Sequence, residues 1–194
     1  IDGNWNSDEA PSAEQMVTSL QKAIDRTGYN LSVSLSRMFG EGRSAGFDLT
    51  DSDSGDMLFS MDIDVNRPLL PTKIYEVDGL HFRGVSPAQM LADKVAAISS
   101  DKVFRRIKHI VDLYYLSQVI EFNKAEIMAA LQTSGRVLED FHGFLRLRGE
   151  LEHAYEKFRF AGDLSKPPFK TVYGSVKSYI KDVLPLEKHL DMER

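Results

Sequence analysis

Two aspartates spaced two residues apart could do metal chemistry. Asp62 and Asp64 lie in the run 57–65, in which apolar and polar residues alternate. Successive side chains of a strand point to opposite faces, so both carboxylates share one face, about 7 Å apart at about 3.4 Å of rise per residue. Such a pair can hold Mg²⁺ together with substrate phosphates. Because alternation alone also predicts the solvated outer face of an antiparallel sheet, both interpretations stay open.

A lysine stands inside the apolar stripe of a predicted helix. At about 100° per residue, Lys94 falls among apolar side chains rather than opposite them. These neighbours are Met90, Leu91, Ala97 and Ile98. A lysine in this position must extend its ammonium to solvent, pair with an acid or face a ligand. Extension to solvent and a functional role are both compatible with the pattern.

The next predicted helix carries a polar stripe. Its members are Arg105, Lys108, His109 and Asp112. Their spacing of i, i+3, i+4 and i+7 places them on one helical face. Because Tyr115 and Leu116 flank Asp112, we expect this carboxylate to need a partner. The alternative is an ordinary surface helix with charge pairs such as Lys108 with Asp112.

Composition and missing motifs exclude several classes of protein. The 194 residues include no cysteine, which removes disulfides and thiolate chemistry, and the five histidines show no ligand spacing. The apolar runs are far shorter than the roughly 20 residues that a membrane-spanning helix needs, so we expect a cytoplasmic protein without a membrane segment. A net charge of −5 means that any contact with nucleic acid must be local. The signatures of hydrolase elbows, P-loops and Rossmann folds are also missing from the sequence.

The elements that must position these residues predict an α+β fold with the sheet first and a helical bundle after it. A capping box of Ser12 and Gln15 begins a helix that extends towards Gly28, and period-two patterns between residues 30 and 66 predict strands. No strand is predicted after the prolines at 68 and 71, and a short segment around 74–82 leads into helices. We expect these helices at about 86–100, with a capping box of Ser86 and Gln89, and at about 101–121, 123–135, 137–159 and 170–184.

Residues 85–116 resemble the C-terminal motif of the AbiEii/AbiGii abortive-infection toxins, a family of nucleotidyltransferases associated with phage defence. The family motif joins an A-[ED]-K helix to an R-x-K-D-x-x-D-[LI]-Y helix. The matching residues are Ala92, Asp93 and Lys94 in the first helix and Arg106, Lys108, Asp112, Leu113 and Tyr114 in the second. His109 stands where the family usually has an acid.

The resemblance implies a fold similar to the polymerase-β-like nucleotidyltransferases, with a mixed sheet, a flanking helix and a C-terminal helical bundle. In this family a D-x-D pair on one strand is joined by a further carboxylate on a neighbouring strand. The implied further carboxylate is Asp62, with Asp64 as its rival, and Asp2 is the implied second acid of the D-x-D pair. The first acid would then precede residue 1. We therefore expect a nucleotidyltransferase-like core over 1–84 and a helical domain over 85–194 that completes the active site.

The same resemblance implies an enzyme that uses Mg²⁺ and an NTP. The implied metal ligands are Asp2, Asp62 and Asp64. The implied catalytic residues are Asp2, Asp62, Lys94 and Asp112, and the implied phosphate-binding residues are Lys94, Arg105, Arg106 and Lys108. Asp112 would either orient Lys94 or act as the base for the acceptor hydroxyl.

The implied biology is that of a toxin in a toxin–antitoxin system. Such a toxin transfers a nucleotide to an RNA, for some members the 3′ end of tRNA, or to a protein, and a cognate antitoxin protein is an expected partner. The alternative is a non-catalytic module of the same fold that binds a nucleotide or a protein.

Overall fold

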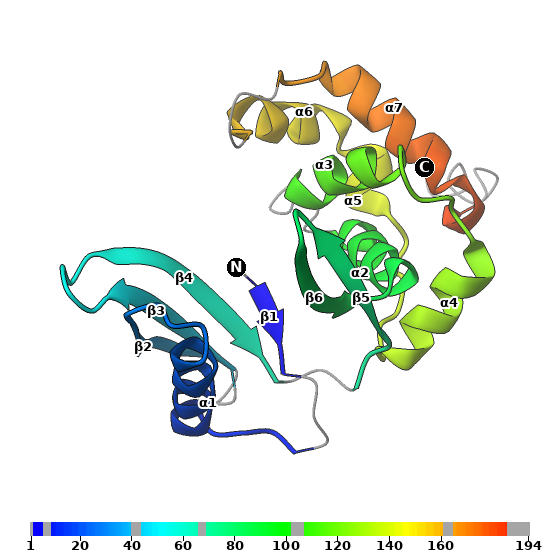
Figure 1. Ribbon diagram of the computed structural model, residues 1–194. Coiled ribbons are helices and arrows are strands. Elements are labelled where there is room, and N and C mark those ends of the chain that lie inside the picture. Colours follow the sequence, from blue (N-terminus) through cyan, green and yellow to red (C-terminus); the bar gives the residue numbers. More distant parts are fainter. Residues whose placement is uncertain are drawn as a thin grey trace. The chain divides into compact units, whose positions relative to one another are not determined.

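The computed structural model describes residues 2–5, 9–39, 44–65, 69–101, 107–160 and 165–185. They belong to two compact units, Ile1–Leu70 and Pro71–Arg194. The first unit contains a mixed sheet and a helix, and the second contains a β-hairpin and a set of helices (Figure 1). The predicted α+β class is therefore confirmed.

The sheet of the first unit has four strands. They are β1 (Asp2–Asn4), β2 (Leu31–Phe39), β3 (Ser44–Asp51) and β4 (Met57–Asp64). Their order across the sheet is β1-β4-β3-β2. The short β1 runs parallel to β4, and the other neighbouring strands are antiparallel. The chain therefore places β1 beside the strand that carries the two aspartates.

Helix α1 (Ala13–Asp25) covers one face of this sheet (Figure 1). It begins at the predicted capping box, in which the Ser12 hydroxyl accepts a bond from the Gln15 backbone N–H and the Gln15 side chain accepts one from the Ser12 N–H. The helix buries Met16 against Phe47 and Ile63 of the sheet. Since side chains alternate along a strand, this packing leaves the polar residues of β3 and β4 on the other face.

Cross-strand hydrogen bonds join polar side chains on that other face. The Ser60 hydroxyl of β4 donates to Asp48 of β3 at 2.7 Å. Ser32 of β2 and Thr50 of β3 share a hydrogen bond of 2.6 Å. We call this face of the sheet, which also carries Asp62, the polar face.

The second unit begins with an antiparallel hairpin of β5 (Thr72–Val77) and β6 (Leu80–Val85). The prediction that no strand follows the prolines is therefore wrong. The turn residues Asp78 and Gly79 have φ values of 51° and 78°. Positive φ at both central residues suits a two-residue hairpin turn, for which Asp-Gly is a favoured sequence.

The described residues after this hairpin include a set of helices that forms the larger core. The helices are α2 (Pro87–Ser99), α3 (Ile107–Leu116), α4 (Lys124–Thr133), α5 (His142–Arg146), α6 (Arg148–Lys157) and α7 (Phe169–Tyr179). Fully buried apolar side chains of these helices, among them Ile98, Ile110 and Leu151, pack into one cluster. This cluster is the frame on which α2 and α3 carry their polar residues.

The single helix predicted over 137–159 is wrong, because the chain forms α5 and α6 there after a non-helical approach. Phe141 has a φ of 61°, which no regular helix contains. Its backbone N–H donates to the Ser99 carbonyl at 3.0 Å, and the Glu139 N–H donates to the Ser99 hydroxyl at 3.0 Å. These bonds to the end of α2 replace the hydrogen bonds that a continuous helix would make.

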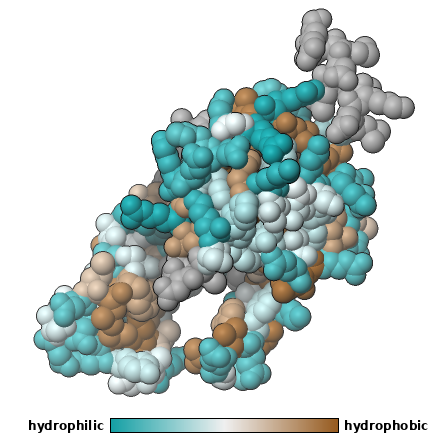
Figure 2. Space-filling view, turned by 90° about the horizontal axis from the view of Figure 1, so that it is seen from above, coloured by the Kyte–Doolittle hydropathy of each residue, from teal (hydrophilic) through white to brown (hydrophobic). Residues whose placement is uncertain are grey.

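The visible surface is mostly hydrophilic, with hydrophobic residues gathered in smaller patches (Figure 2). Within the described ranges, no helix combines the length and the apolar character that crossing a membrane requires.

Candidate active site

Asp62 lies in a row of residues that crosses the whole sheet. Asp2 of β1 and Gly46 of β3 are its register partners, and Arg37 of β2 is the register partner of Gly46. Neighbouring strands lie about 4.8 Å apart, so the backbone places the two acids side by side. The side chain of Asp2 falls outside the described part of the chain.

Arg37 pairs with Asp62 on the polar face. Its Nη2 atom donates to both carboxylate oxygens, at 2.7 Å to Oδ1 and 2.7 Å to Oδ2. The two side chains are 59% and 35% exposed. Hydrogen bonding to Asp62 and its negative charge raise the pKa of Arg37 above its ordinary value. Sequence reasoning did not identify Arg37, because no motif or regular spacing connects it to Asp62.

Asp64 lies on the same face and has a different partner. The hydroxyl of the buried Ser44 donates to its Oδ1 at 2.8 Å. The Asp64 backbone also holds the end of β1, since its carbonyl accepts a hydrogen bond from the Trp5 N–H at 3.0 Å. Asp64 is therefore tied into the sheet by its side chain and by its backbone.

These carboxylates are suited to a hard divalent cation. Mg²⁺ prefers oxygen ligands and is often held by one or two carboxylates together with substrate phosphates. Within the described residues, no group of three or more His, Asp and Glu side chains could hold a metal. Asp62 is partly exposed, and its strand neighbour is Asp2. The donor set therefore fits Mg²⁺ if the Asp2 carboxylate contributes.

Lys94 and Asp112 form an ion pair in the second unit. The Lys94 Nζ atom on α2 lies 2.5 Å from Asp112 Oδ2 on α3. The side chains are 26% and 39% exposed, so both are partly withdrawn from water. The expectation that Asp112 needs a partner is met by the lysine, and the ammonium accordingly pairs with an acid beside the apolar stripe.

A second set of polar contacts holds α2 in place. The Ser86 hydroxyl caps the helix by accepting a bond from the Gln89 N–H at 3.2 Å. The buried Gln89 side chain donates to Asp93 at 3.1 Å, and Arg136 donates to the same carboxylate at 2.9 Å. Asp93 is the neighbour of Lys94, so these contacts fix the turn of α2 that carries the lysine.

The other predicted phosphate-binding residues are described only in part. Lys108 is exposed on α3, and His109, which stands in place of the usual acid, is half-buried on the same helix. Arg105 and Arg106 lie outside the described residues. The predicted site residues thus fall into two groups, with Asp2, Asp62 and Asp64 in the first unit and the others in the second. In the first unit the row across the sheet sets Asp2 beside Asp62, and in the second the contact between α2 and α3 brings Lys94 to Asp112.

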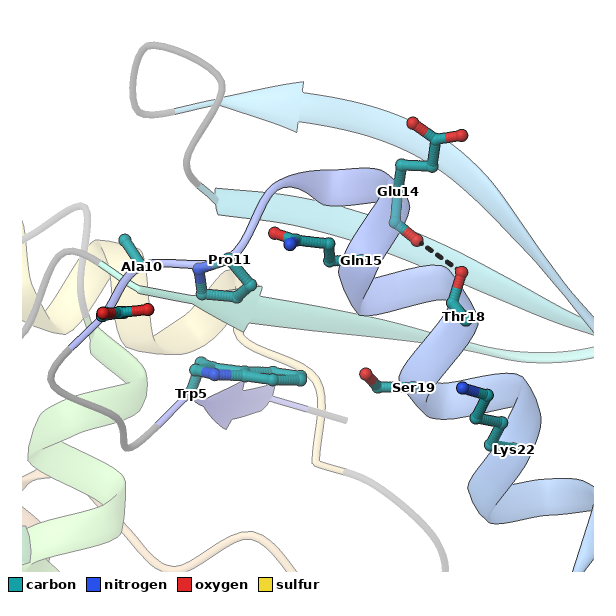
Figure 3. Close-up of a pocket in the computed structure, with 9 residues that line it drawn as sticks. Trp5, Ala10, Pro11, Glu14, Gln15, Thr18, Ser19 and Lys22 are labelled. Carbon is teal, nitrogen blue, oxygen red and sulfur yellow. Dashed lines mark hydrogen bonds between the residues drawn. The ribbon is translucent and has the colours of Figure 1, made fainter.

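A shallow groove of about 570 Å³ lies beside the first turns of α1. The Trp5 ring borders it on one side and Glu14, Thr18 and Ser19 of α1 on the other (Figure 3). Trp5 also packs against the core of the first unit. Its position therefore agrees with a core role for this tryptophan, and neither Asp62 nor Asp64 lines the groove.

Carboxylates on a sheet face are donors that a divalent cation can take, and a lysine ammonium is a group that can bind phosphate. The family model described as nucleotidyl transferase AbiEii toxin of type IV toxin–antitoxin systems matches residues 10–171. The chain belongs to this family and is a nucleotidyltransferase. The predicted resemblance to the AbiEii toxins is thereby confirmed.

Among solved structures, the chain is similar to MenT4, a nucleotidyltransferase toxin from Mycobacterium tuberculosis H37Rv. The two share 14% sequence identity with a TM-score of 0.49, over 93% of this chain and 69% of MenT4. None of the curated proteins compared with the chain matches it.

Proposed function

We propose that this nucleotidyltransferase depends on Mg²⁺ and transfers a nucleotide from an NTP to an RNA or protein acceptor. The 3′ end of tRNA is the first acceptor to test, because the family resemblance implies it for some members. The division into a nucleotidyltransferase-like core over 1–84 and a helical domain over 85–194 that completes the site belongs to the same proposal.

The observation that carries this proposal is the register of β1 against β4. It sets Asp2 beside Asp62 on a sheet whose other face is covered by α1. Carboxylates on neighbouring strands are oxygen donors of the kind that Mg²⁺ takes together with substrate phosphates. Such an arrangement is expected of a metal site, and Asp64 two residues further supplies another oxygen donor on the same face.

The proposed reaction joins an acceptor oxygen to the α-phosphorus of the NTP. The acceptor hydroxyl attacks, the bond from the α-phosphorus to the pyrophosphate oxygen breaks, and the hydroxyl proton leaves to a base. Mg²⁺, when bound, would neutralise phosphate charge and stabilise the leaving pyrophosphate. The carboxylates of Asp2 and Asp62 would hold the cation, with Asp64 as the rival of Asp62.

Lys94 would bind phosphate oxygens of the NTP as a point charge. Asp112 would orient it, and the 2.5 Å contact between Nζ and Oδ2 supports this role over that of a base. An ammonium has three donor hydrogens, so a Lys94 that gives one to Asp112 keeps others for phosphate. Arg105, Arg106 and Lys108 would add local positive charge to a chain whose net charge is −5.

As a member of a toxin–antitoxin family, the chain is expected to have a cognate antitoxin as its protein partner. We place its action in the cytoplasm, where NTPs and tRNA are both present. Its acidic balance and local basic helix are compatible with a small RNA-contacting surface.

Incorporation of labelled NTP tests the proposed function. Each of the four NTPs is incubated with the protein, Mg²⁺ and total tRNA, and label is measured in the RNA and in the protein fraction. We expect label from at least one NTP, and we expect Lys94→Ala to lower the rate about 100- to 1000-fold because a phosphate-stabilising charge is lost. Lys170→Ala is the matched control, since it removes an exposed lysine of α7 and should leave the rate unchanged.

Two results would contradict the proposal. One is full activity of Lys94→Ala, which would remove this lysine from the reaction. The other is the absence of label from both fractions with every NTP, together with an Mg²⁺-dependent thermal shift by NTP. That combination would support the non-catalytic binding module instead.

A further inference from the structure

The position of Arg37 depends on an irregularity in β2. Leu35 pairs with Phe47 and Arg37 with Gly46, so Ser36 is an extra residue without a register partner. In a regular strand, Arg37 would lie on the same face as Leu35, which is the face covered by α1. The bulge at Ser36 turns Arg37 to the polar face instead, which is a recognised use of bulges in strands.

Gly46 gives the arginine its path across β3. A Cβ atom on Gly46 would lie 2.7 Å from Arg37 Cγ and 2.8 Å from its Nε. These distances are far below an ordinary van der Waals contact. The side chain therefore lies directly over the glycine, and only a residue without a side chain permits this approach.

The Asp62 carboxylate also lies close to Gly46. The Cβ position on Gly46 is 2.8 Å from Asp62 Oδ1, so the carboxylate lies over β3. Strand β1, with Asp2 in register, is on the other side of β4. Arg37 thus holds the carboxylate on the side of β4 that faces away from β1.

We propose that Arg37 is an internal competitor of the divalent cation for Asp62. The guanidinium neutralises Asp62 and keeps its carboxylate over β3. To hold a divalent cation together with Asp2, the Asp62 carboxylate would have to give up its hydrogen bonds to Nη2. This inference rests on the proposed function, because it takes the cation site to be the one formed by the two acids.

If Arg37 competes with the cation, its loss should change the metal affinity in the opposite direction from the loss of a residue that positions Asp62. Loss of an outer-sphere residue that orients a ligand weakens metal binding, whereas loss of a competitor strengthens it. We therefore expect Arg37→Ala to bind Mn²⁺ about two- to fivefold more tightly, the size expected from releasing a partly exposed ion pair. Arg37→Lys keeps the charge without the planar fork, and its affinity should lie between those of Arg37→Ala and the wild type.

Titration with Mn²⁺, followed by the electron paramagnetic resonance signal of the free ion, gives the affinity without any turnover. The set contains the wild type, both Arg37 variants, Asp62→Asn and the double variant Arg37→Ala/Asp62→Asn. We expect Asp62→Asn to weaken binding and the double variant to match it, because the arginine acts only through this carboxylate. Arg26→Ala removes an exposed arginine at the end of α1 and should leave the affinity unchanged.

Gly46→Ala separates the pair without deleting either charge. The added methyl group would meet both the Arg37 stem and Asp62 Oδ1, so it should push the two side chains off β3 and raise Mn²⁺ affinity in the same direction as Arg37→Ala. This variant also guards against the interpretation that lost charge alone changes the affinity. Its circular dichroism spectrum, compared with that of the wild type, shows that the fold is retained.

The outcomes separate this inference from the proposed function. Unchanged or weaker Mn²⁺ binding by Arg37→Ala would overturn the competition even if NTP transfer proceeds, and so would an Asp62→Asn variant that binds Mn²⁺ like the wild type. Absence of Mn²⁺ binding and of NTP transfer in every variant would instead overturn the proposed function, and the inference with it.

Discussion

The two cation–carboxylate pairs of this protein are built in different ways. Lys94 and Asp112 meet between two helices that are packed on a common core, and the lysine is the less exposed member, at 26%. Arg37 and Asp62 meet on the open face of a sheet, and the arginine is 59% exposed. One cation is thus held by surrounding packing, and the other is held mainly by its acid partner.

The difference in exposure between the two cations determines which pair can change partners. An exposed ion pair contributes little because water solvates both ions well, so a stronger ligand can displace Arg37 at small cost. Lys94 lies beside a buried stripe, where separation from Asp112 would leave two partly desolvated charges. We therefore expect the pair on the helices to persist during the reaction and the pair on the sheet to be exchanged for metal.

The largest effect that separates the two pairs should come from Asp112→Asn. If Asp112 serves by orienting Lys94, its loss should lower kcat/KM for NTP transfer about 100-fold. The double variant with Lys94→Ala should then be no slower than Lys94→Ala alone, because residues that act as a unit do not add their effects. Rates of label incorporation measured for the four members of this cycle test the expectation.

Glu150→Gln is the control for that cycle, since it removes an exposed carboxylate of α6. A double variant that is slower than both single variants by the product of their effects would show that the two residues act independently. Asp112 would then be the base rather than the orienting residue. The expectation that the Lys94–Asp112 pair persists during the reaction would then fail.

Deletion of a single serine from β2 tests how the bulge places Arg37 in the pair on the sheet. Without Ser36 the strand becomes regular, with Leu35 still opposite Phe47 and Arg37 still opposite Gly46. Deleting Ser34 instead would turn Val33 from the core towards the polar face, because one missing residue reverses the alternation. We expect a loss of about 2 kcal/mol in the free energy of unfolding for the Ser34 deletion and of about 0.5 kcal/mol for the Ser36 deletion.

Urea unfolding of the two deletion variants gives these free energies under the same conditions. Mn²⁺ titration of the Ser36 deletion adds a second readout, which should match the wild type because the arginine keeps its place. Equal destabilisation by the two deletions would show that Ser36 is an ordinary strand residue, and it would remove the bulge as the reason for the position of Arg37.

What could be predicted from the sequence follows from how local each feature is. The first helix and its capping box depend on residues within one turn, and the aspartate pair depends on the period of a single strand. The place of Lys94 on one helical wheel predicts that its ammonium reaches solvent, an acid or a ligand, and the residues that flank Asp112 predict that this carboxylate needs a partner. All of these signals are contained in short windows of the chain.

Features that depend on register or on distant contacts could not be found in this way. The break before α5 arises from bonds to Ser99, about 40 residues earlier in the chain. Arg37 reaches Asp62 because the bulge in β2 lies beside Gly46 of β3. Neither feature predicts this contact until the register of the two strands is known. The hairpin is a different case, since the Asp78-Gly79 turn was a local signal that the prediction did not use.

The smallest expected effect concerns the support of α2. Arg136, three residues after the end of α4, donates to Asp93, and the side chains are 33% and 18% exposed. Arg136→Ala should therefore lower the free energy of unfolding by about 1 kcal/mol. The exposed pair of His153 and Glu156 offers a matched control, and His153→Ala should change stability by less than about 0.5 kcal/mol. If loss of Arg136 also weakens NTP binding while His153→Ala does not, the packing of α2 positions Lys94; if NTP binding is unchanged, Asp112 alone positions it.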